Sequence, residues 1–168
     1  MKIEHLEERI GEYLNSIKTV VEKRIYWNST LKPLVIRILK KAEKTYLIGW
    51  KVQELNWIHT NEAVNITFNS FPPGLIETTN QIPSYQFLQG GSLVFSQKYN
   101  GDVEIFVIFP QVDSITDPSG EMKDLGTYAP NSITEKLIIE KLDDFLREMI
   151  RWEVPLVISG VGFKKTEN

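Results

Sequence analysis

The stretch LVFSQKYNGDVEIFVIF, from Leu93 to Phe109, decides the fold of this chain. Two apolar runs rich in β-branched and aromatic residues flank Asn100-Gly101, a dipeptide typical of a two-residue turn between antiparallel strands. The stretch therefore predicts a β-hairpin that turns at Asn100-Gly101.

A two-residue turn also fixes which residues of the hairpin lie opposite each other. It predicts that Phe95 faces Phe106 and that Leu93 faces Ile108. The second run, residues 103–109, is apolar on both faces apart from one glutamate. We expect a strand of this kind to be central in its sheet and covered by helices on at least one side.

Upstream of the hairpin, the pattern predicts helices. Residues 2–25 carry an apolar stripe with the 3-4 spacing of a helix that packs on a partner helix. Its members are Ile3, Leu6, Ile10, Tyr13, Ile17 and Val20, widened by Leu14 and Val21. Asn28-Ser29-Thr30 predicts a break, and Pro33 suits the first turn of a second helix. We expect an antiparallel helix hairpin over residues 2–44.

From residue 46 the apolar period changes to two, which is typical of strands. Trp50–Ile58 and Ala63–Asn69 are the two runs, with a turn at Thr60-Asn61-Glu62 between them. Together with the hairpin at residues 93–109, they predict an antiparallel sheet within residues 46–110.

The remainder predicts a loop, a helix and a tail. Residues 111–131 are rich in Pro, Gly and Asp, which favours a loop. Ser132 and Glu135 have the spacing of a capping box and predict a helix over 132–152. Residues 153–168 are expected to form a short strand, at Leu156-Val157-Ile158, and a tail.

This order of elements favours one α+β domain over residues 1–168. Strands run consecutively and helices lie at the ends, which is typical of an antiparallel sheet with helices on one side. We expect an N-terminal helix hairpin, a sheet of about four to five strands, and a C-terminal helix packed on the sheet.

Composition narrows the classes of function. The 168 residues include no cysteine and two histidines, which excludes disulfides, cysteine-ligated metal centres and a thiol nucleophile. The N-terminus has no apolar signal region and no run is long enough to span a membrane, so we expect a soluble cytoplasmic protein without membrane contact. The net charge is −3, yet residues 18–44 carry eight basic and two acidic residues, a local charge of +6.

Catalytic residue types are scarce. His59 is the best candidate general base, because imidazole can accept a proton near pH 7, and Glu54 and Glu62 are near it in sequence. The acidic residues of 113–124 lack the spacing of a calcium loop, and no nucleotide or dinucleotide motif is present. We therefore predict no metal and no cofactor, and we lean against an enzyme.

One alternative is a small-ligand or nucleotide-binding protein, or an enzyme with weak sequence signals. Its pocket would lie between the sheet and the 110–131 loop, since long loops often carry function. The residues expected to line it are Trp57, Gln111, Asp113 and Tyr128.

The leading hypothesis is a non-catalytic protein-interaction module. An amphipathic first helix and a basic segment in an acidic chain favour association with a protein partner or with a second copy, and a homodimer through the first helix is one form of it. The basic segment offers Arg37, Lys40, Lys41 and Lys44 as interaction residues. A third alternative is nucleic-acid binding through residues 18–44, against which the overall acidity of the chain argues.

Overall fold

The computed structural model of this chain describes residues 2–56, 61–70, 72–73, 90–110 and 121–155. It confirms the α+β class, with helices at the N-terminus, a five-stranded antiparallel sheet and a C-terminal helix. In chain order the elements are the 3-10 turn η1 (Ile3–Leu6), helix α1 (Glu7–Tyr26), the π-helical turn η2 (Trp27–Leu31), helix α2 (Lys32–Thr45), strands β1 (Trp50–Asn56), β2 (Glu62–Phe68), β3 (Ser92–Gln97), β4 (Val103–Ile108) and β5 (Met122–Tyr128), the 3-10 turn η5 (Pro130–Ser132) and helix α4 (Glu135–Glu153).

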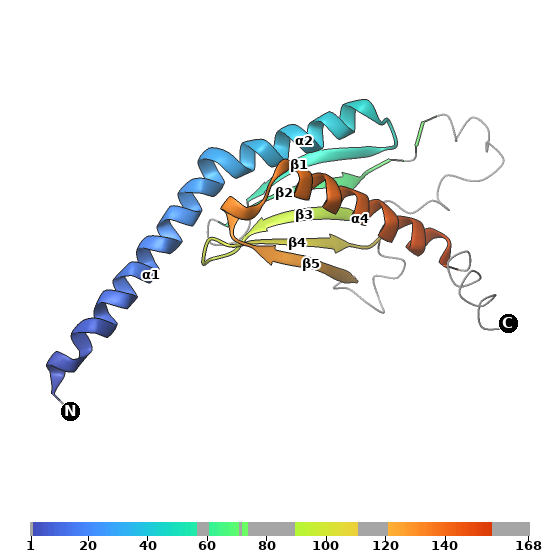
Figure 1. Cartoon of the computed structure of the whole chain (residues 1–168). Coiled ribbons are helices and arrows are strands. Elements are labelled where there is room, and N and C mark those ends of the chain that lie inside the picture. The colour runs from blue at the N-terminus through green and yellow to red at the C-terminus, as the bar shows by residue number, and fades with distance from the viewer. Residues whose placement is uncertain (1, 57–60, 71, 74–89, 111–120, 156–168) are drawn as a thin grey trace.

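The sheet is an antiparallel meander in which each strand pairs with the next, in the order β1-β2-β3-β4-β5. Helices α2 and α4 lie on one face of it (Figure 1). As expected, β4 is a central and largely buried strand. The main core lies between this face and the two helices, and its largest fully buried side chains are Trp27, Phe95, Phe145, Leu31, Leu39, Ile66, Leu93, Ile105 and Ile138.

The fifth strand arises where the sequence predicts only loop. β5 lies inside residues 111–131 and pairs with β4 as an edge strand of the sheet. Its residues are mostly exposed, and its pairing is interrupted by a bulge opposite Glu104–Phe106. Gly126 has a φ of +116° there. Because an exposed, bulged edge strand has little apolar alternation, its sequence resembles a loop. The strand expected at 156–158 lies outside the described residues.

The register of the β3–β4 hairpin differs from the predicted one by one residue. Phe95 pairs with Ile105, and Phe106 pairs with Val94, so the predicted pair of phenylalanines is wrong. The Gly101 N–H donates to the carbonyl of Lys98 over 3.0 Å, and the Gly101 φ is +89°. This is a three-residue connection with glycine in the left-handed region, not the two-residue turn. Since side chains alternate between faces, the one-residue shift places Phe95 and Phe106 on opposite faces of the sheet.

The N-terminal helices do not form the expected antiparallel hairpin. Asn28, Ser29 and Thr30 stay helical in the π-helical turn η2, so α1 continues directly into α2 and the long helix only changes direction (Figure 1). η2 buries Trp27 and Leu31 while these three polar residues stay exposed. Burial of these two large side chains outweighs the capping tendency of the polar residues between them.

The start of the C-terminal helix is also displaced. Thr134, not Ser132, is the N-cap of α4, and its side-chain oxygen accepts a hydrogen bond from the Leu137 N–H over 3.2 Å. Ser132 belongs to η5 and donates to the carbonyl of Ala129. The capping box predicted from Ser132 and Glu135 is therefore wrong, because a second capping residue two positions later begins the helix.

Candidate interaction surface

Helix α1 presents an apolar surface that the described part of the chain leaves uncovered. None of the helix's 20 residues is buried. Eight large apolar side chains between residues 3 and 25 are 46–78% exposed. Six of them lie on α1, where at 100° per residue they gather on one side of the helix, and Ile3 and Leu6 lie on the preceding turn η1. We call this surface the apolar stripe; it consists of Ile3, Leu6, Ile10, Tyr13, Leu14, Ile17, Val21 and Ile25.

The helix projects away from the sheet, with its N-terminal end far from the other elements (Figure 1). Its described tertiary contacts come from its last turns, through residues such as Lys23 and Arg24. The last turns of α1 therefore form a base that is attached to the domain. The apolar stripe extends from this base and is not part of the domain core.

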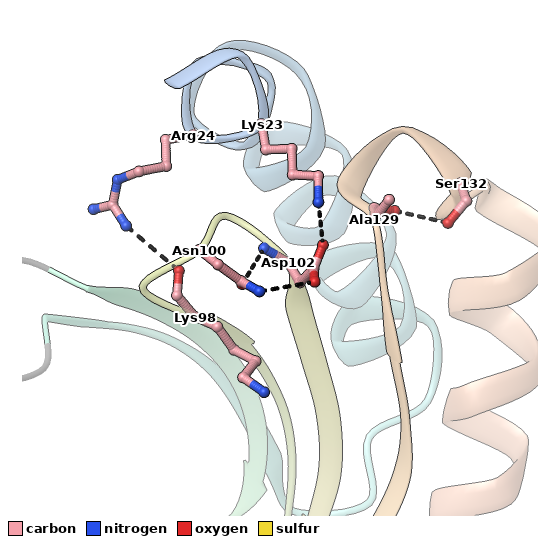
Figure 2. Close-up of polar contacts among 7 residues, drawn as sticks. All are labelled: Lys23, Arg24, Lys98, Asn100, Asp102, Ala129 and Ser132. Atoms are coloured by element: carbon pink, nitrogen blue, oxygen red, sulfur yellow. Dashed lines mark hydrogen bonds and ion pairs between the residues drawn. The ribbon is translucent and has the colours of Figure 1, made fainter. Parts of the chain in front are cut away.

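The tip of the β3–β4 hairpin fastens one side of this base (Figure 2). Lys23 Nζ lies 2.9 Å from Asp102 Oδ1, and Asp102 is itself held by the Asn100 side chain. Arg24 donates to the carbonyls of Lys98 and Tyr99 over 3.4 and 3.2 Å. The Arg24 guanidinium donates to backbone carbonyls, and Lys23 and Asp102 form an ion pair of partly buried groups. Both interactions depend on geometry, so they fix the orientation of α1 against the hairpin and also stabilise the contact.

The end of the β1–β2 pair fastens the other side. The Trp27 indole N–H donates to Glu62 Oε1 over 3.2 Å, and Lys32 Nζ lies 3.1 Å from Glu62 Oε2. Lys32 is also 3.5 Å from Glu54, and Arg24 donates to the Asn61 side chain over 3.2 Å. Glu62 therefore joins both ends of the π-helical turn to the sheet, which fixes the direction in which α1 leaves the domain.

This contact gives a role to two of the residues proposed for catalysis. Glu54 and Glu62 converge on Lys32, 19% exposed, and serve as its counter-ions. His59 lies outside the described residues, so an acid–base site with either glutamate stays a prediction. The interactions of Trp27 and Lys32 with Glu62 could not be predicted from sequence spacing, because these partners are 30 or more positions apart.

The residues proposed to line a ligand pocket are not brought together in the described part of the chain. Trp57, Gln111 and Asp113 lie outside the described residues, and the pocket stays a prediction. Tyr128 ends β5, where its hydroxyl donates to the Leu125 carbonyl over 3.5 Å. The Lys141 ammonium lies 5.6 Å from the centre of its ring, a cation–π geometry that joins β5 to α4.

The predicted basic interaction residues lie on α2. Lys40 and Lys41 are exposed and Arg37 Nη2 is 3.8 Å from Glu135 of α4, while Lys44 is in the last turn of the helix. Solvated lysines and arginines of this kind interact weakly with single partners at physiological salt. These side chains are accessible to an acidic surface of a partner. Within the described residues, however, no second observation beside them points to a binding site.

A buried polar side chain escaped the sequence reasoning. Asn65 alternates with the apolar residues Val64 and Ile66 along β2, yet it is 7% exposed. It lies on the sheet face opposite α2 and α4, beside the small apolar cluster of Ala63, Val94 and Phe106. Its Oδ1 atom accepts no hydrogen bond in the described part of the chain. An unpaired buried acceptor is costly, so Asn65 is expected to lower the stability of the sheet.

Neither a metal centre nor a membrane span emerges from the residues that the structure describes. They hold no group of three or more His, Cys, Asp or Glu side chains suited to a metal ion. None of their helices combines the length and apolarity needed to cross a bilayer. No family model, no curated protein and no solved structure matches this chain.

Proposed function

We propose that this protein is a self-associating interaction module in which the apolar stripe of α1 packs against the same stripe of a second copy. The observation that carries the proposal is that α1, 20 residues long, buries none of its residues. Most of the stability of a helix in a protein comes from tertiary packing of its amphipathic face, and α1 lacks such packing. A partner that covers the stripe would supply the missing tertiary stabilisation.

A second α1 helix is the occupant that the stripe fits best. The positions Ile3, Leu6, Ile10, Tyr13 and Ile17 alternate at three and four residues, the spacing by which one helix receives another. A copy of the same helix has this spacing by construction. An anionic membrane is a poorer match, because the polar side of the helix carries Glu4, Glu8 and Glu12 where membrane-binding helices carry Lys and Arg.

Light scattering and sedimentation of the full chain over a concentration series test the proposal. We expect a weight-average mass that rises from one to two chains across the micromolar range. Replacing Ile10 and Ile17 together by Ser removes the centre of the stripe and should leave a monomer. The matched control, Glu8→Ser with Asn15→Ser, changes the polar side of the same helix and should associate like the original chain.

The helical circular dichroism signal gives a second readout. Because pairing stabilises α1, the signal per residue should increase with concentration for the original chain and for the control. A monomer mass at about 1 mM would refute the proposal, since that corresponds to less than about 4 kcal/mol of association energy. Equal association of the stripe variant and the control would refute it as well.

A further inference from the structure

We infer that Glu43 of α2 closes the outer edge of strand β1 against pairing with the β1 strand of a second copy. Within the described part of the chain, β1 is an edge strand whose one neighbour in the sheet is β2. Edge strands present a row of backbone N–H and C=O groups with which another chain can pair. The inference does not rest on the proposed association through α1, because it concerns a different surface of the domain.

The pairing of the sheet decides which backbone groups of β1 point outward. The N–H and C=O of Phe68 in β2 both bind the Gly90–Gly91 segment, which precedes β3. They therefore point away from Trp50, the partner of Phe68 in β1. Backbone groups alternate in direction along an antiparallel strand, so those of Trp50 and Val52 point outward and those of Gln53 point toward β2.

Glu43 occupies one of these outward groups in the middle of the edge. The Val52 N–H donates to Glu43 Oε1 over 2.8 Å, a hydrogen bond that the charge of the carboxylate strengthens. Glu43 is half-buried, so its side chain lies against the edge of the strand. An incoming strand would have to displace this carboxylate before its own carbonyl could bind the Val52 N–H.

The position of Glu43 goes against the charge preference of a helix end. It is the single acidic residue among the 14 residues of α2, and it lies in the last turn. The C-terminal end of a helix carries a partial negative charge and favours Lys, Arg or His. Residues that depart from the local preference commonly serve a specific contact, and the contact with the Val52 N–H is the one that Glu43 makes here.

Two further contacts hold α2 alongside β1 (Figure 1). Before Glu43 in the sequence, Lys32 Nζ lies 3.5 Å from the Glu54 carboxylate. After it, the carbonyl of Tyr46 accepts a hydrogen bond from the Trp50 indole N–H over 2.8 Å. Because α2 is attached to β1 on both sides of Glu43, the carboxylate is held at the edge.

The opposite edge of the sheet is protected in a different way. The pairing of β5 is interrupted by a bulge, where the Gly126 N–H donates to Asp124 Oδ1 over 2.9 Å. A bulge disturbs the regular row of backbone groups that an incoming strand needs. β1, in contrast, keeps an unbroken register with β2 over its seven residues, so it is the edge that a second copy could extend.

Amide hydrogen exchange of the full chain, followed by NMR, tests the hydrogen bond. Glu43→Ala removes the acceptor, whereas Glu43→Gln keeps an oxygen in its place and is the matched control. We expect the Val52 N–H to exchange about tenfold faster in the Ala variant and at an unchanged rate in the Gln variant. The Gln53 N–H, which points toward β2, is the internal reference, because a general loss of stability would accelerate the exchange of both amides.

Light scattering of chains with a disrupted apolar stripe tests the closure of the edge. In the Ile10→Ser, Ile17→Ser background, adding Glu43→Ala should at least double the weight-average mass across the micromolar range, whereas adding Glu43→Gln should not. Lys23→Met in the same background controls for a loss of stability elsewhere in the domain. The outward N–H of Glu54 should become protected from exchange as the Glu43→Ala chains associate, which identifies pairing through β1.

Two results would overturn the inference. One is equal acceleration of the Val52 and Gln53 amides in Glu43→Ala, which would mean that the carboxylate does not protect the edge in particular. The other is a mass that Glu43→Ala leaves unchanged, or a larger mass without protection of the Glu54 N–H. Each comparison is made within one background, so neither result bears on association through α1.

Discussion

Lys23 and Asp102, 79 positions apart in the sequence, form an ion pair in which Nζ and Oδ1 are 2.9 Å apart. Their side chains are 29% and 24% exposed, so the pair is only partly screened by water. It ties the last turns of α1 to the tip of the β3–β4 hairpin (Figure 2). The apolar stripe is thereby aimed by a contact with a distant part of the chain.

Removing this ion pair should weaken the domain. Lys23→Met keeps most of the aliphatic stem and deletes the charge, and we expect the free energy of unfolding to fall by about 1 kcal/mol. Urea denaturation measures the change. Lys18→Met, on an exposed position of the same helix, is the control and should change stability by less than about 0.5 kcal/mol. Equal effects of the two substitutions would show that the ion pair contributes nothing.

Two glycines should respond to alanine with opposite signs, and Gly101 is the sensitive one. Its φ of +89° is strained for alanine, and the new Cβ would lie 2.5 Å from Lys23 Cβ. We expect Gly101→Ala to lower the free energy of unfolding by about 1–3 kcal/mol. Chemical denaturation followed by fluorescence is a suitable measurement, and an unchanged midpoint would contradict the close approach of hairpin and helix.

Gly11 is the tolerant one, in the exposed middle of α1. Among the described residues, no atom outside the neighbouring helix backbone lies within 4 Å of the place that a Cβ on Gly11 would take. Gly11→Ala should therefore favour the helix by about 1 kcal/mol, the difference in intrinsic propensity. A larger helical circular dichroism signal at low protein concentration, where association is least, is the expected result. A smaller signal would mean that the glycine has a structural role in α1.

Glu62 should matter more than an exposed glutamate. Glu62→Ala removes the acceptor of the Trp27 indole N–H and the nearer counter-ion of Lys32, and we expect a loss of about 2 kcal/mol. Glu62→Gln keeps an oxygen for the indole and should lose clearly less. Thermal and urea unfolding of both variants give the comparison. If both variants lose the same amount, the indole hydrogen bond makes no measurable contribution.

Asn65 should be replaceable with a gain in stability. Its buried Oδ1 atom is unpaired in the described residues, so Asn65→Val removes an unsatisfied acceptor and adds a strand-forming side chain. We expect the free energy of unfolding to rise by about 1 kcal/mol. Gln53→Val, at the exposed cross-strand partner of Asn65, controls for strand propensity alone. A loss of stability on Asn65→Val would reveal that the asparagine makes a favourable interaction.

Sequence predicted the order and type of most elements because their periodicity is strong. The helical stripe of residues 2–25 and the C-terminal helix are long enough for the period to be unambiguous. The β4 run has no such period, and its β-branched residues and the adjacent Asn100-Gly101 turn identified it as a strand. Boundaries and register depended on details that periodicity does not contain. Whether Asn100 or only Gly101 takes a left-handed conformation decides between a two- and a three-residue turn, and with it which residues face the core.

Elements stabilised by distant contacts were harder to predict. The π-helical turn exists because Trp27 and Leu31 both reach the core, although the residues between them favour a break. β5 forms because β4 offers it an edge, not because its own sequence alternates. The stripe on α1 was visible in the sequence, whereas the ion pairs that orient it join residues that sequence spacing cannot connect.

The π-helical turn at Trp27–Leu31 has a mechanical consequence. With a rise of about 1.5 Å per residue, the 20 residues of α1 form an arm about 30 Å long. A rotation of about 10° at the turn would therefore carry the far end of the arm through about 5 Å, roughly one helical pitch. Small changes in geometry around Glu62 or Asp102 are amplified along the arm, so the reach of the N-terminal end is set at its opposite end.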